Sequence, residues 1–171
     1  MRRVIDVISA ANVAVGHVVR WLLVVMVVVG SANAGLRYAS RYLGTNLSSN
    51  GLVELQWYLF AAVFLLAAPY TLQRNRHVRV DVLYGRLSPR AQAGIDLAGS
   101  LLFLVPFSVF GVLSAWPAVS QSIAIGEMSP DPGGLPRYPV KALVPIAFAL
   151  LALQGLVQIR DAIERLQGET S

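Results

Sequence analysis

The stretch Arg74–Arg90, RNRHVRVDVLYGRLSPR, separates two apolar halves of a 171-residue sequence. It contains five arginines and no lysine, and it is the densest cluster of charge in the chain. The apolar runs on either side are each long enough to cross the roughly 30 Å hydrocarbon core of a bilayer as a helix. The stretch therefore predicts a polar connector outside the membrane, and its side of the membrane orients the remainder of the chain.

The composition on both sides of this connector is that of a membrane protein. The chain is 56% hydrophobic and 13% charged, with a mean hydropathy of +0.60. Soluble domains are typically about 45–50% apolar and about 25% charged. Because there is no cysteine, disulfides, zinc–thiolate sites and thiol nucleophiles are excluded. The formal charge of +5 does not indicate nucleic-acid binding, because the arginines lie at the ends of apolar runs.

The apolar runs predict an all-α integral membrane protein with four transmembrane helices and short interfacial amphipathic helices, in one membrane domain over residues 1–171. The expected spans cover about 18–36, 55–73, 97–115 and 142–159. Residues 74–90 form the connector, in which the alternation of apolar and polar residues between Val78 and Leu87 predicts a short interfacial helix. Residues 127–141 form a loop, because four prolines and two glycines in fifteen residues cannot sustain a helix.

Prolines and a serine add local detail to this outline. Ser88 followed by Pro89 predicts the start of the helix that leads into the third span. Pro106 lies within that span and should bend it. Pro145 should fall in the first turn of the last span, where proline is tolerated. After that span, Asp161 and Arg165 have the i,i+4 spacing of a helical ion pair.

The amino-terminal segment 1–17 is amphipathic, with its apolar and polar residues on different helical faces. The apolar face contains Val4, Ile5, Ile8, Ala11 and Val15, and Arg2, Arg3, Asp6, Ser9 and Asn12 lie elsewhere. We expect an interfacial helix that runs into the first span, and the alternative is the hydrated first turns of that span. A signal peptide cleaved near Ala32–Ala34 is a further alternative, although its long charged start with Asp6 is atypical.

The distribution of lysine and arginine predicts the orientation. Ten of these residues fall in the amino-terminal segment, the connector and the carboxyl-terminal tail, and the other four fall in the two remaining loops. The four are Arg37, Arg41, Arg137 and Lys141. The positive-inside rule therefore predicts that both termini and the connector are cytoplasmic and that the 127–141 loop is periplasmic.

Residues that would carry chemistry of their own are scarce. The sequence has no P-loop, no dinucleotide-binding glycine motif and no zinc-protease motif, so we expect no catalytic residue, no metal site and no cofactor. Its two histidines, His17 and His77, lie outside the apolar runs, which does not favour a haem-anchoring subunit. No charge lies at the centre of a span, although transport sites usually place one there. This pattern is typical of a non-catalytic subunit.

Two polar residues near or within the spans allow two interpretations each. Glu54 is either a buried proton-coupling carboxylate or an acid at the start of a helix, and the neighbouring Trp57 and Tyr58 favour the second. Gln154 either contacts a substrate or forms a hydrogen bond to a neighbouring helix, and the hydrogen bond is the commoner use.

Three groups of residues, in order along the chain, carry a resemblance. The first is His77-Val78-Arg79-Val80-Asp81 with Leu83, after the second span. The second is Glu127-Met128-Ser129-Pro130 followed by Gly134-Leu135-Pro136-Arg137. The third is Lys141, then Leu143-Val144-Pro145, then Ala149–Gln154. Over roughly residues 51–160 the chain resembles the small membrane subunit (the Q subunit, DctQ-like) of tripartite ATP-independent periplasmic (TRAP) transporters. Arg76 stands where many relatives have glycine.

The resemblance implies a complex in the bacterial inner membrane, with this chain as a multi-pass component. A periplasmic solute-binding protein would capture a small organic anion, usually a carboxylate. A large multi-span membrane subunit would carry it inward by symport with an ion, typically sodium. The small subunit would scaffold the large one, with the lipid bilayer as its other surroundings.

The resemblance also selects candidate residues for the interface with these partners. They are Arg76, His77, Arg79, Asp81, Glu127, Arg137, Lys141 and Gln154. Arg79 and Asp81 could pair with each other or with the large subunit, and a lipid phosphate is an equal alternative for Arg79. Glu127 and Arg137 could help to dock the binding protein or could form an ion pair within the loop.

Two functions of other classes remain as alternatives to the subunit hypothesis. In the first, the protein is a self-sufficient small ion-coupled transporter with Glu54 as the coupling acid. In the second, it is a membrane anchor for a redox enzyme, which the positions of the histidines do not favour.

Overall fold

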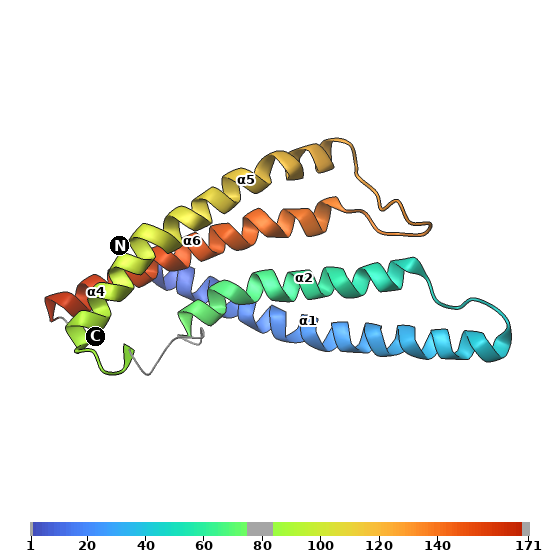
Figure 1. Ribbon diagram of the computed structural model, residues 1–171, viewed down its shortest axis with the longest axis horizontal. Helices are drawn as coiled ribbons and strands as arrows, with labels where there is room; N and C mark the ends of the chain where they lie inside the picture. The colour runs from blue at the N-terminus through green and yellow to red at the C-terminus, as the bar shows by residue number, and fades with distance from the viewer. Residues whose placement is uncertain (1, 75–83, 169–171) are drawn as a thin grey trace.

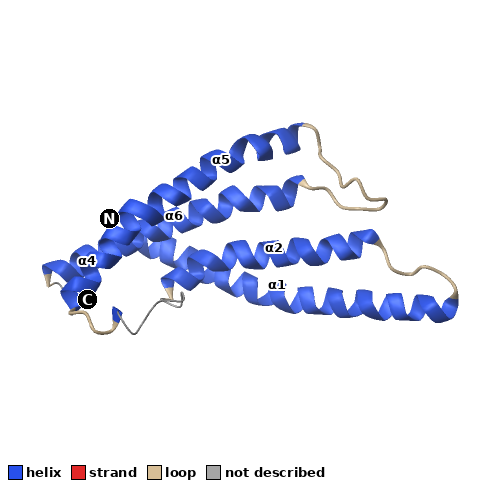
Figure 2. Cartoon of the chain, viewed as in Figure 1, coloured by secondary structure: helices blue, strands red, loops and turns tan. Residues whose placement is uncertain are grey.

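The computed structural model describes residues 2–74 and 84–168, and this part of the chain is almost entirely helical. Four of its helical stretches are long and apolar enough to cross a membrane, which confirms the predicted fold class. The chain forms two helical hairpins, one from each half of the sequence (Figure 1). No strand is drawn in the described part (Figure 2), where the only β-type pairing is an isolated bridge between Met128 and Pro136.

The first hairpin consists of α1 (Arg2–Leu43) and α2 (Asn50–Gln73), which pack against each other. Ser49 caps α2, because its side-chain oxygen accepts a hydrogen bond from the Leu52 N–H at 3.3 Å. The α2 helix therefore begins five residues before the predicted start at residue 55, and it includes Glu54 in its first turns.

The α1 helix differs from the expectation of an interfacial segment followed by a span. It runs from Arg2 to Leu43 without a break, and its 42 residues extend about 63 Å. Its buried residues near the amino terminus are Asn12, Gly16 and Val19, not the apolar face seen in the sequence. Asn12, which lies off that apolar face, is fully buried.

The second hairpin begins with α4 (Pro89–Gly99) and continues through a π-helical turn, η1 (Ser100–Leu104), into α5 (Val105–Ala124). The predicted cap at Ser88 is confirmed, since its side-chain oxygen accepts a hydrogen bond from the Ala91 N–H at 3.3 Å. The departure from α-helical hydrogen bonding lies just before Pro106, which lacks an N–H to donate. The helix also continues nine residues beyond the expected end at residue 115.

The α6 helix (Tyr138–Gln167) is the central element, because it contacts α1, α2, α4 and α5. It starts four residues before the predicted span, with Pro139 in its first turn. The expectation that Pro145 occupies the first turn was therefore wrong: it lies inside the helix and is buried. The charged tail after residue 159 is part of the same helix, which ends at Gly168 in a left-handed conformation.

The ends of the four long helices fall into two groups (Figure 1). One group, here called the loop end, contains the α1–α2 loop (44–49) and the α5–α6 loop (125–137). The other, here called the terminal end, contains the start of α1, the end of α2, the start of α4 and the end of α6. This arrangement is the one expected of four spans with both termini on one side of a membrane.

Candidate functional site

The α5–α6 loop at the loop end is a folded hairpin rather than an open chain. Its two sides are joined by a hydrogen bond from the Ser129 N–H to the Leu135 carbonyl at 3.1 Å. A second joins the Arg137 N–H to the Glu127 carbonyl at 2.8 Å. Gly133 takes a positive φ of 72° at the turn, a conformation that glycine adopts without strain. The loop is therefore ordered by its own backbone.

Glu54 of α2 holds this loop in place. Its carboxylate accepts a hydrogen bond from the Leu135 N–H at 2.5 Å and a second, short one from the Ser129 hydroxyl. The residue is 4% exposed, so both acceptor oxygens are committed within the chain. Glu54 is thus an acid in the first turns of its helix, as the sequence favoured, and it joins the first hairpin to the second.

The approach of the loop to α2 requires glycine at position 134. A Cβ atom there would lie 2.5 Å from the Ser129 Cβ atom and 2.9 Å from a Glu54 carboxylate oxygen. Beside it, the Asn50 side-chain amide donates a hydrogen bond to the Pro132 carbonyl at 3.1 Å. Together these contacts explain physically why the loop contains serine, glycine and leucine at these positions.

Glu127 forms an ion pair, but with Lys141 at the start of α6 rather than with Arg137. The Ser122 hydroxyl also donates to its carboxylate, at 2.6 Å. The Lys141 ammonium, followed by the Ser122 hydroxyl, lowers the pKa of the Glu127 carboxyl below its ordinary value of 4.5. Two of the interface candidates, Glu127 and Lys141, are therefore partners of each other.

Arg137 contributes to the loop through its backbone. Of the two alternatives for Glu127 and Arg137, the ion pair within the loop is not formed: among the described residues only their backbone groups meet, and Glu127 pairs with Lys141. The guanidinium is half-buried, and its buried Nε atom has no hydrogen-bond partner among the described residues. Its positive charge lies close enough to act on both Glu54 and Glu127.

Gln154 lies inside the chain, where it joins α6 to α1. Its side-chain oxygen accepts a hydrogen bond from the Asn12 side-chain amide at 2.7 Å, and the two residues are 4% and 0% exposed. Of the two interpretations of Gln154, the structure shows the hydrogen bond to a neighbouring helix. This side chain contacts α1 and has little surface to present to another protein.

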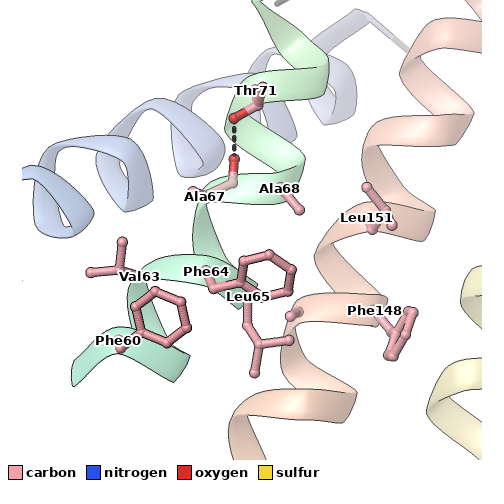
Figure 3. Close-up of a pocket in the computed structure, with 10 residues that line it drawn as sticks. Phe60, Val63, Phe64, Leu65, Ala67, Ala68, Thr71, Phe148 and Leu151 are labelled. Atoms are coloured by element: carbon pink, nitrogen blue, oxygen red, sulfur yellow. Dashed lines mark hydrogen bonds between the residues drawn. The ribbon is translucent and has the colours of Figure 1, made fainter. Parts of the chain in front are cut away.

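An apolar groove, here called the α2–α6 groove, runs between these two helices (Figure 3). It has a volume of about 520 Å³. Phe60, Val63, Phe64, Leu65, Ala67, Ala68, Thr71, Ala147, Phe148 and Leu151 line it. The Thr71 hydroxyl donates to the Ala67 carbonyl at 2.8 Å, so the one side-chain hydroxyl of the lining is bonded within its own helix.

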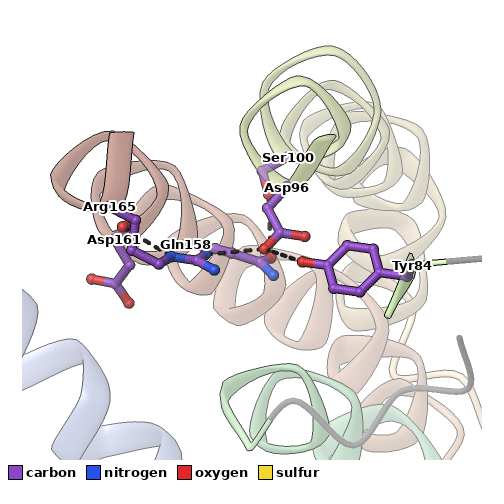
Figure 4. Close-up of polar contacts among 6 residues, drawn as sticks. All are labelled: Tyr84, Asp96, Ser100, Gln158, Asp161 and Arg165. Atoms are coloured by element: carbon purple, nitrogen blue, oxygen red, sulfur yellow. Dashed lines mark hydrogen bonds and ion pairs between the residues drawn. The ribbon is translucent and has the colours of Figure 1, made fainter. Parts of the chain in front are cut away.

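At the terminal end, a polar cluster ties α4 to α6 (Figure 4). The Asp96 carboxylate accepts a hydrogen bond from the Tyr84 hydroxyl at 2.8 Å and pairs with Arg165 at 3.0 Å. One turn on, the Ser100 hydroxyl donates to the Gln158 side-chain oxygen at 3.2 Å. The predicted Asp161–Arg165 side-chain pair is wrong: Arg165 reaches Asp96 instead and donates only to the Asp161 backbone carbonyl.

The other four interface candidates, Arg76, His77, Arg79 and Asp81, lie outside the described residues. Most of the expected interfacial helix between Val78 and Leu87 does so as well. In the described part of the chain, no group of three or more His, Asp or Glu side chains is arranged to hold a metal ion.

Sequence reasoning missed the roles of Asn12, Ser129 and Asp96. Helical periodicity placed Asn12 off the apolar face and gave it no role, yet an amide in a helix near a membrane also suits a partner such as Gln154. Ser129 was recognised as part of a motif, but nothing local to it indicates Glu54, which is 75 residues away. Asp96 was included in the helix before the third span without a role.

A comparison with protein-family models gives one match, over residues 35–165. The family is described as "Tripartite ATP-independent periplasmic transporters, DctQ component". The match covers the described loop-end contacts and the whole polar cluster at the terminal end. No curated protein and no solved structure gave a significant match to the chain.

Proposed function

Because the chain belongs to the DctQ family, the small membrane component of tripartite ATP-independent periplasmic (TRAP) transporters, we propose that it is a non-catalytic scaffold for the large transport subunit. The large multi-span subunit would move the solute. A periplasmic binding protein would deliver it, and an ion gradient would drive its symport. The proposed solute is a small organic anion, most simply a carboxylate. The complex would lie in the bacterial inner membrane.

The scaffold role is supported by one observation: the buried polar side chains are already hydrogen-bonded within the chain. A transport site within the chain needs polar side chains that are free to bind a solute or ion. Here Glu54 is bonded to the α5–α6 loop, Gln154 to Asn12, and the Ser108 hydroxyl to the Leu104 carbonyl at 2.7 Å. The first two bonds join separate elements of the chain, and the third lies within one helical stretch, so all three groups are already bonded within the chain. This favours a rigid scaffold over a moving carrier.

The loop end supports a second part of the proposal, in which the α5–α6 loop contributes to docking of the binding protein. The loop is held rigidly by Glu54 and by the Glu127–Lys141 pair. A preorganised surface loses less conformational entropy on binding than a flexible one. In this scheme Glu127, Lys141 and Arg137 shape the docking surface more than they bind the partner.

The connector supports the third part, contact with the large subunit at the cytoplasmic side. We assign this role to Arg79 and Asp81, with Arg76 and His77 beside them, on the family resemblance and on their charge. Alanine at Arg79 or at Asp81 should reduce co-purification of the large subunit, and Arg90→Ala is the matched control in the same connector. Full co-purification with both variants would remove the two residues from the interface.

The test of the whole proposal is identification of what co-purifies with the tagged protein. Extraction in mild detergent followed by mass spectrometry should recover one large polytopic membrane protein in stoichiometric amount. A stable homo-oligomer that transports alone in liposomes would contradict the scaffold role.

Glu54→Gln separates this proposal from a self-sufficient carrier. Glutamine keeps a side-chain oxygen to accept from Leu135 but loses the charge, so a structural acid predicts reduced assembly with an unchanged pH profile of uptake. A coupling acid predicts instead that the pH dependence of uptake disappears while the protein remains fully assembled.

A further inference from the structure

The α2–α6 groove has the shape of a site for one lipid chain, and it has a charged residue at one end. Arg74 follows α2 directly, seven residues or about two helical turns after Ala67, so it lies on the same face as the groove lining. We propose that this groove binds one anionic phospholipid, with an acyl chain between α2 and α6 and the phosphate at Arg74. This proposal does not depend on the proposed function.

The length of the site matches one leaflet of a bilayer. Phe60 and Arg74 are fourteen residues apart along the helix, which corresponds to about 21 Å. Half of a bilayer comprises about 15 Å of hydrocarbon and about 5–7 Å of interfacial region. A phospholipid with its phosphate at Arg74 therefore reaches the far end of the groove at Phe60, near the bilayer centre.

The apolar part of the site is hollow because small side chains line it. Ala67, Ala68 and Ala147 are among the lining residues, and the exposed rings of Phe60 and Phe64 lie along the α2 side (Figure 3). The Phe148 ring packs against Gly111 and Phe107 of α5. The Phe60 and Phe64 rings stack, with centroids 6.3 Å apart, and both side chains are well exposed. An acyl chain can fill such a groove by van der Waals contact without displacing a polar partner.

The Arg74 side chain is exposed but has an aromatic contact within the chain, to Tyr70 one turn earlier in α2. Its guanidinium carbon lies 5.5 Å from the centre of the Tyr70 ring. Tyr70 in turn packs on Gly16 of α1, where a Cβ atom would lie 2.6 Å from the ring. Among the described residues no carboxylate pairs with Arg74, so its charge is available to a phosphate.

A second groove in the chain serves as an internal comparison. It lies between α5 and α6, has a volume of about 370 Å³ and is equally apolar. Leu156 lines it, and the arginine one turn further on, Arg160, is paired with Glu164 at 2.5 Å. This second groove offers an apolar surface without a free cation, so it should show no preference for anionic lipid. Basic sites between transmembrane helices select lipids by their anionic head groups.

The test is native mass spectrometry of the protein, alone and with any large subunit that co-purifies, from nanodiscs of phosphatidylglycerol and phosphatidylcholine in equal parts. We expect one phosphatidylglycerol to be retained by the wild type. Arg74→Gln should lower its retention about fivefold, the effect of losing one arginine near a membrane surface. Ala68→Phe should abolish retention by filling the groove.

Two matched controls and the melting temperature of each variant accompany this measurement. Arg90→Gln removes another exposed arginine of the connector, and Ala152→Phe fills the α5–α6 groove; both should leave phosphatidylglycerol retention unchanged. If Ala68→Phe fails to fold, the Arg74→Gln variant still tests the proposal. The Arg74 side chain is exposed at the end of α2, so its replacement should leave the fold intact.

Three results would overturn the proposal. Equal retention of the two lipids by the wild type would show that the net negative charge of the head group plays no part. An equal loss of phosphatidylglycerol with Arg90→Gln would show that retention depends on the net charge of the protein and not on Arg74. Cross-linking from Ala68→Cys to the large subunit would show that a protein helix occupies the groove; the chain has no other cysteine, so this cross-link is unambiguous.

Discussion

Among single residues, Glu54 has the greatest structural consequence. It is the acidic residue nearest to a membrane span in the first half of the chain, and it binds a loop 75 to 81 residues away. A buried carboxylate that accepts two hydrogen bonds is stabilised, whereas its removal leaves the Leu135 N–H and the Ser129 hydroxyl without their acceptor. The residue therefore acts on the relative position of the two hairpins.

Gly134→Ala should destabilise the protein, because the new methyl group collides with Ser129 and with the Glu54 carboxylate. Overpacking of this kind typically costs about 1–3 kcal/mol, which a lower melting temperature in detergent would show. Gly94→Ala is the control: it lies in α4 with nothing within 4 Å of the added atom, so alanine should raise stability by about 0.5–1 kcal/mol. Equal effects of the two substitutions would contradict the role assigned to Gly134.

Acid should loosen the α5–α6 loop through Glu127. Because Lys141 and Ser122 lower the pKa of its carboxyl in the folded protein, this group stabilises the fold above its ordinary pKa of 4.5. That contribution is lost as the pH falls below 4.5 and through the lower pKa of the folded state. The protection factor of the Arg137 amide, which donates to the Glu127 carbonyl, should therefore fall over this window in the wild type, once the exchange rate is corrected for the intrinsic pH dependence of an unprotected amide.

The variant Glu127→Gln provides the comparison for this measurement. Glutamine cannot ionise, so the protection factor of the same amide should already be lower at neutral pH. It should change little further on acidification. An identical pH profile for wild type and variant would assign the loosening to another group.

Among the helices, α6 organises the fold, because it contacts α1, α2, α4 and α5. Two of its contacts use polar pairs, Gln154 with Asn12 and Arg165 with Asp96. The first lies within the bundle, and the second lies in the extension of α6 beyond the predicted span. That extension was expected only as a charged tail, yet it holds the start of the second hairpin.

The Asp96–Arg165 pair should couple α4 to α6 measurably. In a double-mutant cycle with Asp96→Asn and Arg165→Gln, we expect a coupling energy of about 0.5–1 kcal/mol, since Arg165 is partly exposed and screened by solvent. The unfolding free energies of the four proteins give this value. The pair Arg160→Gln and Asp96→Asn is the control and should be additive, because Arg160 pairs with Glu164. A coupling near zero in both cycles would mean that the Asp96–Arg165 contact contributes nothing.

For the whole molecule, the two ends of the bundle differ in charge and in chain connections. The terminal end contains the described helix ends that adjoin the two termini and the arginine-rich connector, and the loop end contains the two hairpin loops (Figure 1). The fold establishes which segments share an end. The distribution of arginine and lysine then predicts that the terminal end is cytoplasmic.

Single-cysteine labelling should test this orientation, since the natural chain has no cysteine to interfere. Thr45→Cys and Asp131→Cys lie in the two loops of the loop end, and Arg90→Cys lies in the connector. A membrane-impermeant maleimide should label the first two in intact spheroplasts and the third only after permeabilisation. The opposite pattern would invert the topology and move the α5–α6 loop away from any periplasmic partner.

The sequence by itself determined the class of protein, the number of spans, the Ser88 cap and the family. The class, the spans and the cap follow from local properties: the transfer energy of an apolar run, the length of a helix, and the chemistry of a helix start. The family follows from the resemblance carried by three groups of residues. Helix ends were predicted less well, because α1, α5 and α6 extend beyond their most apolar segments and packing supports the additional turns.

Only the tertiary structure decided which residues meet. Asn12 and Gln154 are 142 residues apart, and Glu54 and Leu135 are 81 apart, so no local pattern pairs them. Hydrophobicity could not identify the inner face of α1 either, since lipid and the protein interior are similarly apolar and exert no sorting force between helix faces. In this chain the buried positions are therefore set by hydrogen bonds and by glycines such as Gly16 and Gly134, where close packing leaves no space for a side chain.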